Sequence, residues 1–461
     1  MTTPEAGTDT IAAISTPPGR GGIGIVRLSG PQAVPIALEL VRARQPLEHQ
    51  RARLAVIFDD DGVSRIDEAV VTLYAAPNSY TAEDVVEIAA HGSPVVLQWL
   101  LRRALERGAR LAAPGEFTQR AFLSGRLDLT QAEAVRDLIE AQTIVQARLA
   151  ASQMGGALSR RVAPAKQSLI ALVALLEAGI DFAEDDVDVA PHEEIARRIN
   201  GIRPELEALE ASFARGRILH DGLTLAIVGR PNAGKSSLFN RLVERDRAIV
   251  TATPGTTRDL VSERISLGGI PIELVDTAGL RAEAIEEAEQ LGIRRSHEAM
   301  ADAALVLIVL DATQPINDEE RRLLESVVAR PAVVAINKCD LATAETEAGQ
   351  ADEPMLAGRM VLATSALTGE GITELREKIL SLATGGAAAE PGMLTNLRQH
   401  QAVTTALAAL ADAAKANRDN VPHEMLLLDL YRALWALDSL TGQTTTDDIL
   451  NHIFAFFCIG K

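Results

Sequence analysis

A glycine-rich loop between a strand and a helix constrains this chain more than any other feature. Residues 223–228 are apolar and partly β-branched, which predicts a buried strand, and a helix-forming segment follows the loop. Gly229 to Ser236 fits G-x-x-x-x-G-K-S. In this pattern backbone N–H groups surround phosphates, the lysine (Lys235) reaches the β/γ oxygens and the serine (Ser236) holds Mg²⁺. A chance glycine turn is the alternative, and the flanking strand and helix argue against it.

Two further polar strings follow predicted strands. Asp276 to Gly279 comes after the strand Ile270–Val275, which places a carboxylate near the Mg²⁺ and a glycine near the γ-phosphate. Asn337 to Asp340 comes after the strand Ala332–Ile336. An aspartate can accept hydrogen bonds from N1 and N2 of guanine, a pairing that adenine does not offer. These strings therefore predict a nucleotide site that selects guanine.

A last string, Thr364 to Ala366, follows the predicted strand Met360–Ala363 and closes the same pocket. Each string alone is weak, but together they occur in one order and each lies at the end of a strand. The segment resembles a GTP-binding domain of the translation-factor-related class. It predicts a P-loop GTPase domain with a mostly parallel sheet and flanking helices.

Composition limits where the chain works and what it binds. Its 461 residues, 47% of them hydrophobic, can form two to four domains. No apolar run is long enough to span a membrane, and the first residues lack the features of a secretory signal. Only two cysteines are present, which fits a reducing cytoplasm. A net charge of −18 disfavours a broad cationic RNA surface, so any RNA contact is expected to be local or shared with a partner.

The N-terminal part predicts a small α+β domain that ends near Arg120. A Pro-Pro-Gly-Arg-Gly-Gly turn joins its first two strands, and its glycines permit the backbone to approach another group closely, although an ordinary hairpin or crossover loop is the alternative. The predicted strands are Ile11–Ile14, Ile23–Leu28, Ala52–Phe58, Glu68–Tyr74 and Glu83–Ala89, and the predicted helices are Pro31–Arg42 and Ser93–Glu106.

Helical periodicity dominates on both sides of the GTP-binding segment. The first predicted helix runs from Asp128 to Ser152, with Thr130 as its N-cap and Glu133 completing a capping box. Further helices are predicted at Leu158–Ala178, Glu193–Arg215, Leu397–Ala416 and Met425–Leu440. We therefore expect a multidomain α/β protein with a GTP-binding domain (216–384) inserted into a helical domain (121–215 plus 385–461), after an α+β domain (1–120).

Several longer segments point to one family. They are TPPGRGGIGIVRLSG near the N-terminus, PGEFTQRAFLSGRLDLTQAEAV from Pro114 to Val135, TATPGTTRD, DTAGLR and the C-terminal FCIGK. They closely resemble the bacterial tRNA modification GTPases of the TrmE/Era-like class, over essentially the whole chain. The resemblance implies a homodimer that works with the FAD protein MnmG, in a heterotetramer, to add an aminomethyl-type group to the wobble uridine of certain tRNAs. It also implies that a tetrahydrofolate of the 5-formyl or methylene type supplies the one-carbon unit.

The same resemblance implies that the N-terminal domain (1–120) forms the dimer and contains a reduced-folate site. The residues of this site are Arg27, Glu87, Arg126 and Lys461. A pterin can donate to the one carboxylate, and a glutamate tail can pair with the three cations. Ordinary surface salt bridges are the alternative explanation. Position 126 is commonly lysine in the family, and Ala82 stands where the family usually has glycine.

The resemblance extends the nucleotide site to the first switch. Thr257 joins Ser236 on Mg²⁺, while K⁺ takes the place of an arginine finger and is held by Asn232, Thr251, Thr253 and Thr256. The predicted GTP-binding residues are Asn232, Ala233, Gly234, Lys235, Ser236, Ser237, Thr251, Ala252, Thr253, Pro254, Gly255, Thr256, Thr257, Asp276, Thr277, Ala278, Gly279, Asn337, Lys338, Asp340, Ser365 and Ala366.

The group that orients the attacking water is less direct to assign. Leu280 occupies the position where many small GTPases have a glutamine, and it cannot hydrogen-bond. In the resembling family a glutamate of the second switch orients the water, which corresponds to Glu289, with Glu286 or Glu287 as the alternative. Arg281 is expected to hold that switch.

Cys458 lies three residues before the predicted folate contact at the C-terminus, and a catalytic role for its thiol is a hypothesis beside that of a small buried hydrophobe.

The predicted function is GTP hydrolysis, with Lys235 and Glu289 as catalytic residues, driving a conformational cycle in tRNA modification. A GTP-dependent ribosome-assembly or signalling switch without base chemistry is the alternative, because such proteins share the GTP-binding motifs. A nucleotide-regulated scaffold that has lost hydrolysis is a third possibility.

Overall fold

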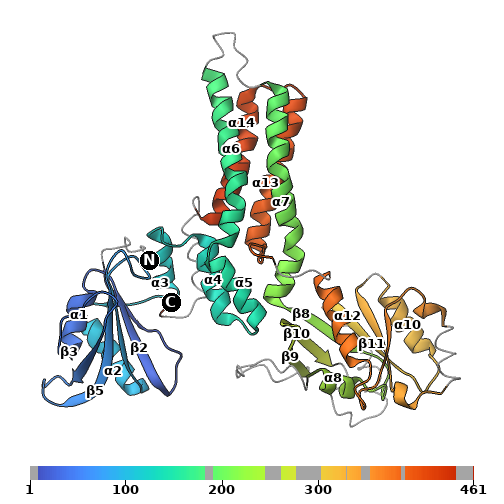
Figure 1. The fold of residues 1–461 in the computed structure, drawn as a ribbon, viewed down its shortest axis with the longest axis horizontal. Coiled ribbons are helices and arrows are strands. Elements are labelled where there is room, and N and C mark those ends of the chain that lie inside the picture. Colours follow the sequence, from blue (N-terminus) through green and yellow to red (C-terminus); the bar gives the residue numbers. More distant parts are fainter. Residues whose placement is uncertain are drawn as a thin grey trace. The chain divides into compact units, whose positions relative to one another are not determined.

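A computed structural model shows the fold (Figure 1). It describes residues 9–181, 191–243, 261–276, 303–328, 330–343, 353–385, 390–442 and 460, with the backbone alone at 179, 181, 261–264, 276 and 384. The chain divides into two compact units, which are described separately. The first contains Met1–Arg136, Gln153–Ser159 and Leu427–Lys461, and the second contains Asp137–Ser152 and Arg160–Leu426.

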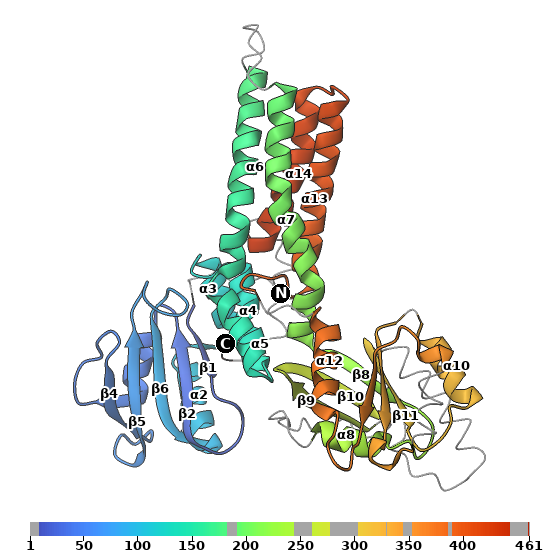
Figure 2. The ribbon, with the colours of Figure 1, turned by 45° about the vertical axis from the view of Figure 1, so that its right-hand side comes forward.

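The first unit contains a seven-stranded sheet in the order β3-β4-β5-β6-β2-β1-β7. Figure 2 shows β4, β5, β6, β2 and β1 side by side. Neighbouring strands are antiparallel except β1 and β7, which are parallel. The strands are β1 (Ile11–Ile14), β2 (Gly21–Ser29), β3 (Val41–Ala43), β4 (Ala52–Phe58), β5 (Arg65–Tyr74), β6 (Val85–Gly92) and β7 (Arg110–Leu111).

Different helices pack on the two faces of this sheet. On one face, Val26, Leu28 and Ile88 are buried in a core with residues of α1 (Ala33–Leu40) and α2 (Pro94–Glu106). On the other face, Ile11 and Ala13 pack with Phe117 of α3 (Glu116–Leu123). Because side chains alternate along a strand, Arg27 and Glu87 lie on the face that α3 covers.

Two local predictions for this domain need correction. The helix predicted to reach Arg42 ends at Leu40, because the β-branched Val41 is extended and pairs with Ile57 in the sheet. Of the glycines predicted to form a turn, Gly19 lies in the loop, but Gly21 and Gly22 begin β2, where a Cβ on Gly92 would lie 2.5 Å from the carbonyl oxygen of Gly21. The close approach is therefore required by Gly92 of β6, whereas a Cβ at Gly19 or Gly22 would meet no other atom within 4 Å.

The first predicted helix is two helices, and its cap is different. They are α4 (Leu129–Glu140) and α5 (Ile144–Met154). The predicted cap, Thr130, lies inside α4. Asp128 instead accepts from the Gln131 amide (2.9 Å), while the Gln131 side chain accepts from the Asp128 amide (3.0 Å). A second reciprocal pair, Thr143 and Gln146, begins α5.

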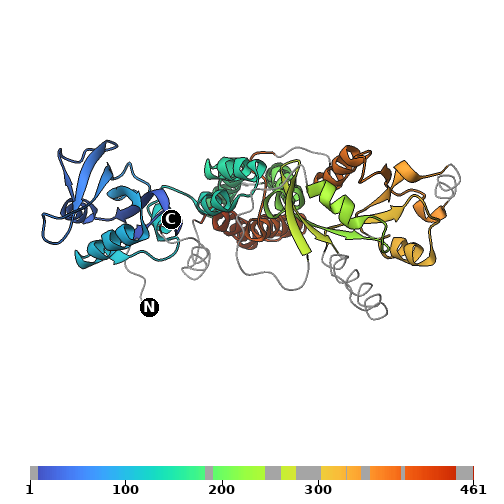
Figure 3. The ribbon, with the colours of Figure 1, turned by 90° about the horizontal axis from the view of Figure 1, so that it is seen from below.

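The second unit contains long helices and a six-stranded sheet. Its helices include α7 (His192–Asp221) and α13 (Leu397–Arg418), which lie side by side and are seen end on from below (Figure 3). The helix predicted to end at Arg215 continues to Asp221, and Gly222 alone separates it from the first strand of the sheet. The remaining long helices are α6 (Ala157–Asp181) and α14 (His423–Thr441), each of which has residues in both units.

The six-stranded sheet has the order β13-β12-β11-β8-β10-β9, parallel except for β9. Its apolar core contains residues of α8 (Lys235–Val243) and α12 (Ile372–Thr384) on one face, and of α10 (Asp318–Ser326) on the other. The strands are β8 (Leu223–Val228), β9 (Val261–Leu267), β10 (Ile270–Asp276), β11 (Leu305–Asp311), β12 (Ala332–Asn337) and β13 (Val361–Thr364), and two short 3₁₀ helices are η2 (Cys339–Leu341) and η3 (Pro354–Leu356).

This arrangement confirms the expected fold class, an α+β sheet domain, long helices and a P-loop sheet with flanking helices. The core of the six-stranded sheet also includes Leu149 and Met393, from segments outside 216–384. The exact domain boundaries stay a prediction. Among the described residues, none of the helices has the length and apolar character needed to cross a membrane.

Candidate functional site

The phosphate loop connects β8 directly to α8. Lys235, the first residue of α8, is buried, and its Nζ donates to the carbonyls of Gly229 (2.6 Å) and Arg230 (2.8 Å). These contacts hold the ammonium across the loop. Because phosphate oxygens carry charge and carbonyls do not, a bound nucleotide can replace these contacts with stronger ones.

Both glycines of the motif are required by close packing. Gly229 has φ +151, and a Cβ there would lie 2.2 Å from the carbonyl oxygen of Val309. Gly234 has φ +91, and a Cβ there would lie 2.2 Å from Nδ2 of Asn337. A side chain at either position would force the loop away from its neighbours.

Asn337 joins three of the predicted segments. Its Nδ2 donates to the carbonyl of Ala233 in the phosphate loop (3.0 Å), and its Oδ1 accepts from the amide of Ala366 after β13 (3.0 Å). The buried Ser365 accepts from the amide of Thr368 through its Oγ (3.1 Å). Asn337 therefore holds the phosphate loop and the segment after β13 together at one edge of the sheet. The exposed Asp340 follows three residues later, in η2.

The other described nucleotide-site residues lie at the same edge. Asn232 is exposed and has φ +63, and Ser236 and Ser237 are exposed at the start of α8. Asp276 ends β10, where its backbone is opposite Ile227 of β8. The remaining predicted residues lie outside the described residues: Thr251, Ala252, Thr253, Pro254, Gly255, Thr256, Thr257, Thr277, Ala278, Gly279, Arg281, Glu286, Glu287, Glu289, Cys458 and Lys461.

A second polar site lies on the α3 side of the first sheet. Arg27 and Glu87 are opposite each other on β2 and β6. The Arg27 guanidinium donates to Oε1 of Glu87 through Nε (2.9 Å) and Nη2 (2.7 Å), and both side chains are largely buried. Arg27 also lies over the rings of Tyr80 (5.9 Å) and Phe117 (5.5 Å). This is a shielded, aromatic-lined ion pair rather than an ordinary surface salt bridge.

Two further segments reach this ion pair. Arg27 Nη1 donates to the carbonyl of Gly460 (3.2 Å), and Ser15 Oγ donates to the same oxygen (3.1 Å). Gly460 is thereby held at the site, and the predicted Lys461 after it lies outside the described residues. Arg126 instead donates to the carbonyl of Ser79, next to Tyr80.

Tyr80 lies between these groups. Its hydroxyl is 2.9 Å from Oγ1 of Thr118 on α3. Burial raises the pKa of Tyr80, although the hydrogen bond with Thr118 and the charges of Arg27 and Arg126 oppose that effect. The neutral phenol is therefore the form present near pH 7.

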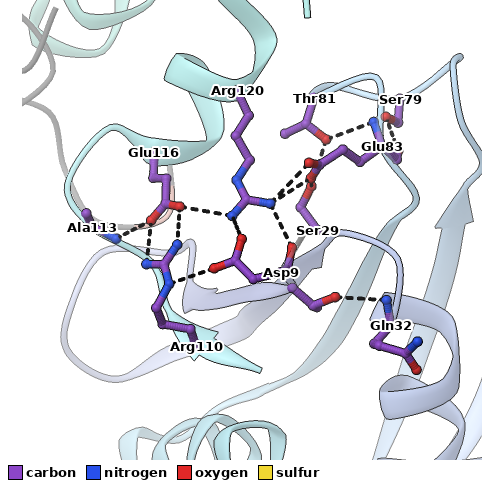
Figure 4. Close-up of polar contacts among 11 residues, drawn as sticks. Asp9, Ser29, Gln32, Ser79, Thr81, Glu83, Arg110, Ala113, Glu116 and Arg120 are labelled. Atoms are coloured by element: carbon purple, nitrogen blue, oxygen red, sulfur yellow. Dashed lines mark hydrogen bonds and ion pairs between the residues drawn. The ribbon is translucent and has the colours of Figure 1, made fainter. Parts of the chain in front are cut away.

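A charged network that the sequence reading missed holds α3 against the sheet (Figure 4). Arg120, 6% exposed, donates to Asp9 (2.6 Å), Glu83 (3.1 Å) and Glu116 (3.0 Å). Arg110 pairs with Asp9 (2.8 Å) and Glu116 (2.5 Å). The sequence indicated this network only through the four-residue spacing of Glu116 and Arg120, which places two opposite charges on the same side of a helix.

The network is linked to the strand that carries Arg27. Ser29 Oγ donates to Oε2 of Glu83 (2.7 Å), and Ser29 lies two residues after Arg27 on the same face of β2. Although burial acts in the opposite direction, Arg110 and Arg120 hold the pKa values of Asp9 and Glu116 below their usual range. These carboxylates are therefore ionised at neutral pH.

Comparisons with known proteins identify the family of the chain. The family model "MnmE helical domain" matches residues 129–458, and the model "GTP-binding protein TrmE N-terminus" matches residues 10–126. The tRNA modification GTPase MnmE of Koribacter versatilis is 57% identical, over 98% of this chain and 99% of that protein. The protein of the same name from Moorella thermoacetica is 42% identical over 98% and 99%. Among solved structures, the G domain of the T. maritima FeoB iron transporter is 29% identical, covering 35% of this chain and 98% of its own, with a TM-score of 0.26.

Proposed function

The chain belongs to the MnmE family of tRNA modification GTPases, and from this we propose that its GTP hydrolysis drives a conformational cycle in wobble-uridine modification. With MnmG and a reduced folate, the cycle adds a carboxymethylaminomethyl or aminomethyl-type group to C5 of the wobble uridine. We further propose that a homodimer carries out this work in the cytoplasm, within a heterotetramer that includes MnmG.

The proposal that the protein binds a reduced folate rests on the contacts of Arg27. Its guanidinium contacts Glu87 and the carbonyl of Gly460, so an anionic group and the C-terminal segment meet in one aromatic-lined site. A pterin has N–H donors that suit a buried carboxylate, and the glutamate tail of a folate needs cations such as Arg126 and Lys461. The bound folate would supply the one-carbon unit, while these residues would bind and orient it.

In the GTP reaction, we assign each residue a separate task. Lys235 and the loop amides would stabilise charge on the β- and γ-phosphates, while Asp340 would select guanine. Ser236 and Thr257 would hold Mg²⁺, and Asn232, Thr251, Thr253 and Thr256 would hold K⁺. Glu289 would orient the attacking water. Steep activation by K⁺ over Na⁺ would support this assignment, and equal rates in both salts under dimerising conditions would contradict it.

The test is mass spectrometry of wobble nucleosides in tRNA from cells that lack this chain. Complementation with the intact protein should restore the aminomethyl-type uridine, whereas Glu87→Gln should not. Glu87→Gln should also abolish 5-formyltetrahydrofolate binding but leave GTP hydrolysis unchanged, because Glu87 lies in the other unit of the chain. Unchanged wobble uridines together with altered ribosome profiles would favour the assembly-switch alternative.

A further inference from the structure

Asp311 belongs to none of the recognised GTP-binding motifs, yet it lies in the middle of the site. It ends β11, next to Asn337 on the neighbouring strand β12. Its side chain is 7% exposed, and Oδ2 accepts from Lys338 Nζ at 2.7 Å. Oδ1 accepts from the amide (2.9 Å) and hydroxyl (2.7 Å) of Thr313. Both oxygens of this carboxylate are therefore fixed.

A second cation connects Asp311 to the phosphate loop. Arg230, the residue after Gly229, lies with Nη2 3.8 Å from Oδ2 of Asp311 and Nε 3.4 Å from Oε1 of Glu320. Glu320 is buried and forms the capping box of α10 with Asn317. In the part of the chain that the structure describes, Arg230 thus lies near two carboxylates, those of Asp311 and Glu320.

The contact with Lys338 matters because of the backbone at that residue. Lys338 has φ +65, a left-handed conformation that costs a non-glycine residue about 1 kcal/mol. Lys338 caps η2, and its carbonyl accepts from the amide of Leu341 (2.9 Å). The turn that presents Asp340 therefore starts from a strained residue, and Asp311 holds the side chain of that residue.

We propose that Asp311 is a positioning residue for guanine recognition, which fixes Lys338 so that Asp340 is presented to the base at one angle. This role differs from that of Asn337, which joins backbone groups of the phosphate loop and the segment after β13. It deepens the proposed function, because it rests on guanine-nucleotide binding by this site.

The experiment compares the dissociation constants of GDP and IDP, since inosine lacks the 2-amino group that Asp340 would bind. Asp311→Asn keeps the shape but removes the charge. We expect GDP binding to weaken about tenfold and the preference for GDP over IDP to fall severalfold. Lys338→Met should produce the same fall in preference, and the double variant should be no worse than either single one. Asp318→Asn, at an exposed carboxylate of α10, is the matched control.

An equal loss of GDP and IDP affinity would overturn the proposal. It would show a general defect of the site, which weakens both nucleotides alike, rather than a change in recognition of the base. Unchanged affinities would overturn it as well. Should Asp311→Asn fail to fold, Thr313→Val provides the comparison, because it removes the hydroxyl that donates to Oδ1 of Asp311 and Thr313 is not one of the predicted GTP-binding residues. Failure of the unaltered protein to bind GDP would instead contradict the proposed GTPase function.

Discussion

The phosphate loop and the Arg27 site are held by different kinds of interaction. In the loop, glycines permit the backbone conformation, backbone carbonyls accept from Lys235, and the side chain of Asn337 donates to the carbonyl of Ala233. At the Arg27 site, charged side chains from β2 and β6 meet the C-terminal Gly460, and the Arg120 network anchors the covering helix α3. The loop depends on backbone conformation and glycine, whereas the second site depends on ion pairs between segments far apart in the chain.

This difference determines how each site should respond to substitution. A site held by backbone contacts can lose one side chain and keep its shape, so the substitution should lower the activity rather than the stability. When one member of a buried charged pair is removed, the other charge is left without a partner, so the substitution should lower the free energy of unfolding. The predictions below test that distinction, from the largest expected effect to the smallest.

Lys235→Ala should reduce the rate of GTP hydrolysis by a factor of at least about 10² to 10³, since it removes a charge aimed at the phosphates. The shape of the loop depends on its glycines and backbone conformation, so the midpoint of thermal unfolding should change little. Hydrolysis and unfolding are measured on the same preparation. Lys415→Ala, at an exposed position of α13, controls for the loss of a positive charge. A large loss of stability in Lys235→Ala would contradict the distinction.

Arg120→Gln should show the opposite pattern. It leaves the buried Glu116 and the half-buried Asp9 and Glu83 with too few cations, which should cost about 3 kcal/mol of unfolding free energy. GTP hydrolysis by the folded variant should be unchanged, because Arg120 makes no described contact with the nucleotide site. Denaturant unfolding followed by far-UV circular dichroism measures the cost. Arg51→Gln removes a guanidinium from the exposed pair with Glu48 and should change stability by less than about 1 kcal/mol.

The same contrast explains what could be predicted from the sequence. The loop and the segments joined by Asn337 were predictable, because each is a short string at the end of an apolar strand. Arg120 was not, because its partners Asp9 and Glu83 are distant in sequence and charged residues at the surface look the same. The Arg27 site was assigned only through family resemblance. Asp128 was missed as a helix cap because Thr130 and Glu133 offered an equally good pattern.

His220 tests whether paired charges also support the second unit. It lies near the end of α7, with Nε2 3.1 Å from Asp137 and Nδ1 2.7 Å from Asp221, and its carbonyl accepts from Gln146 (2.6 Å). Burial alone would lower its pKa, but the two carboxylates raise the pKa of His220 to about 10. His220→Gln should therefore cost about 2 kcal/mol of unfolding free energy near pH 7.

The pH dependence follows from the direction of this shift. Because the folded pKa is above the unfolded value of about 6.5, the contribution of His220 is complete below that value and is lost as pH rises through about 10. The difference in stability between the unaltered protein and His220→Gln should shrink over that range. His91→Gln, at an exposed histidine paired with Asp67, should show a much smaller difference. A difference that is constant with pH would show that hydrogen bonding, not charge, is responsible.

The smallest effect concerns backbone strain, which both sites contain. Asn232 and Lys338 at the nucleotide site and Ala82 beside Tyr80 all have φ near +63 to +65. Alanine has no side-chain polar group to compensate for the left-handed conformation, so Ala82→Gly should raise the unfolding free energy of the first unit by up to about 1 kcal/mol. The matched change Ala408→Gly, at an exposed position inside α13, should lower stability by about 1 kcal/mol, because glycine disfavours a helix. Equal signs for the two changes in chemical denaturation would mean that the Ser79–Ala82 turn adopts another backbone conformation in solution.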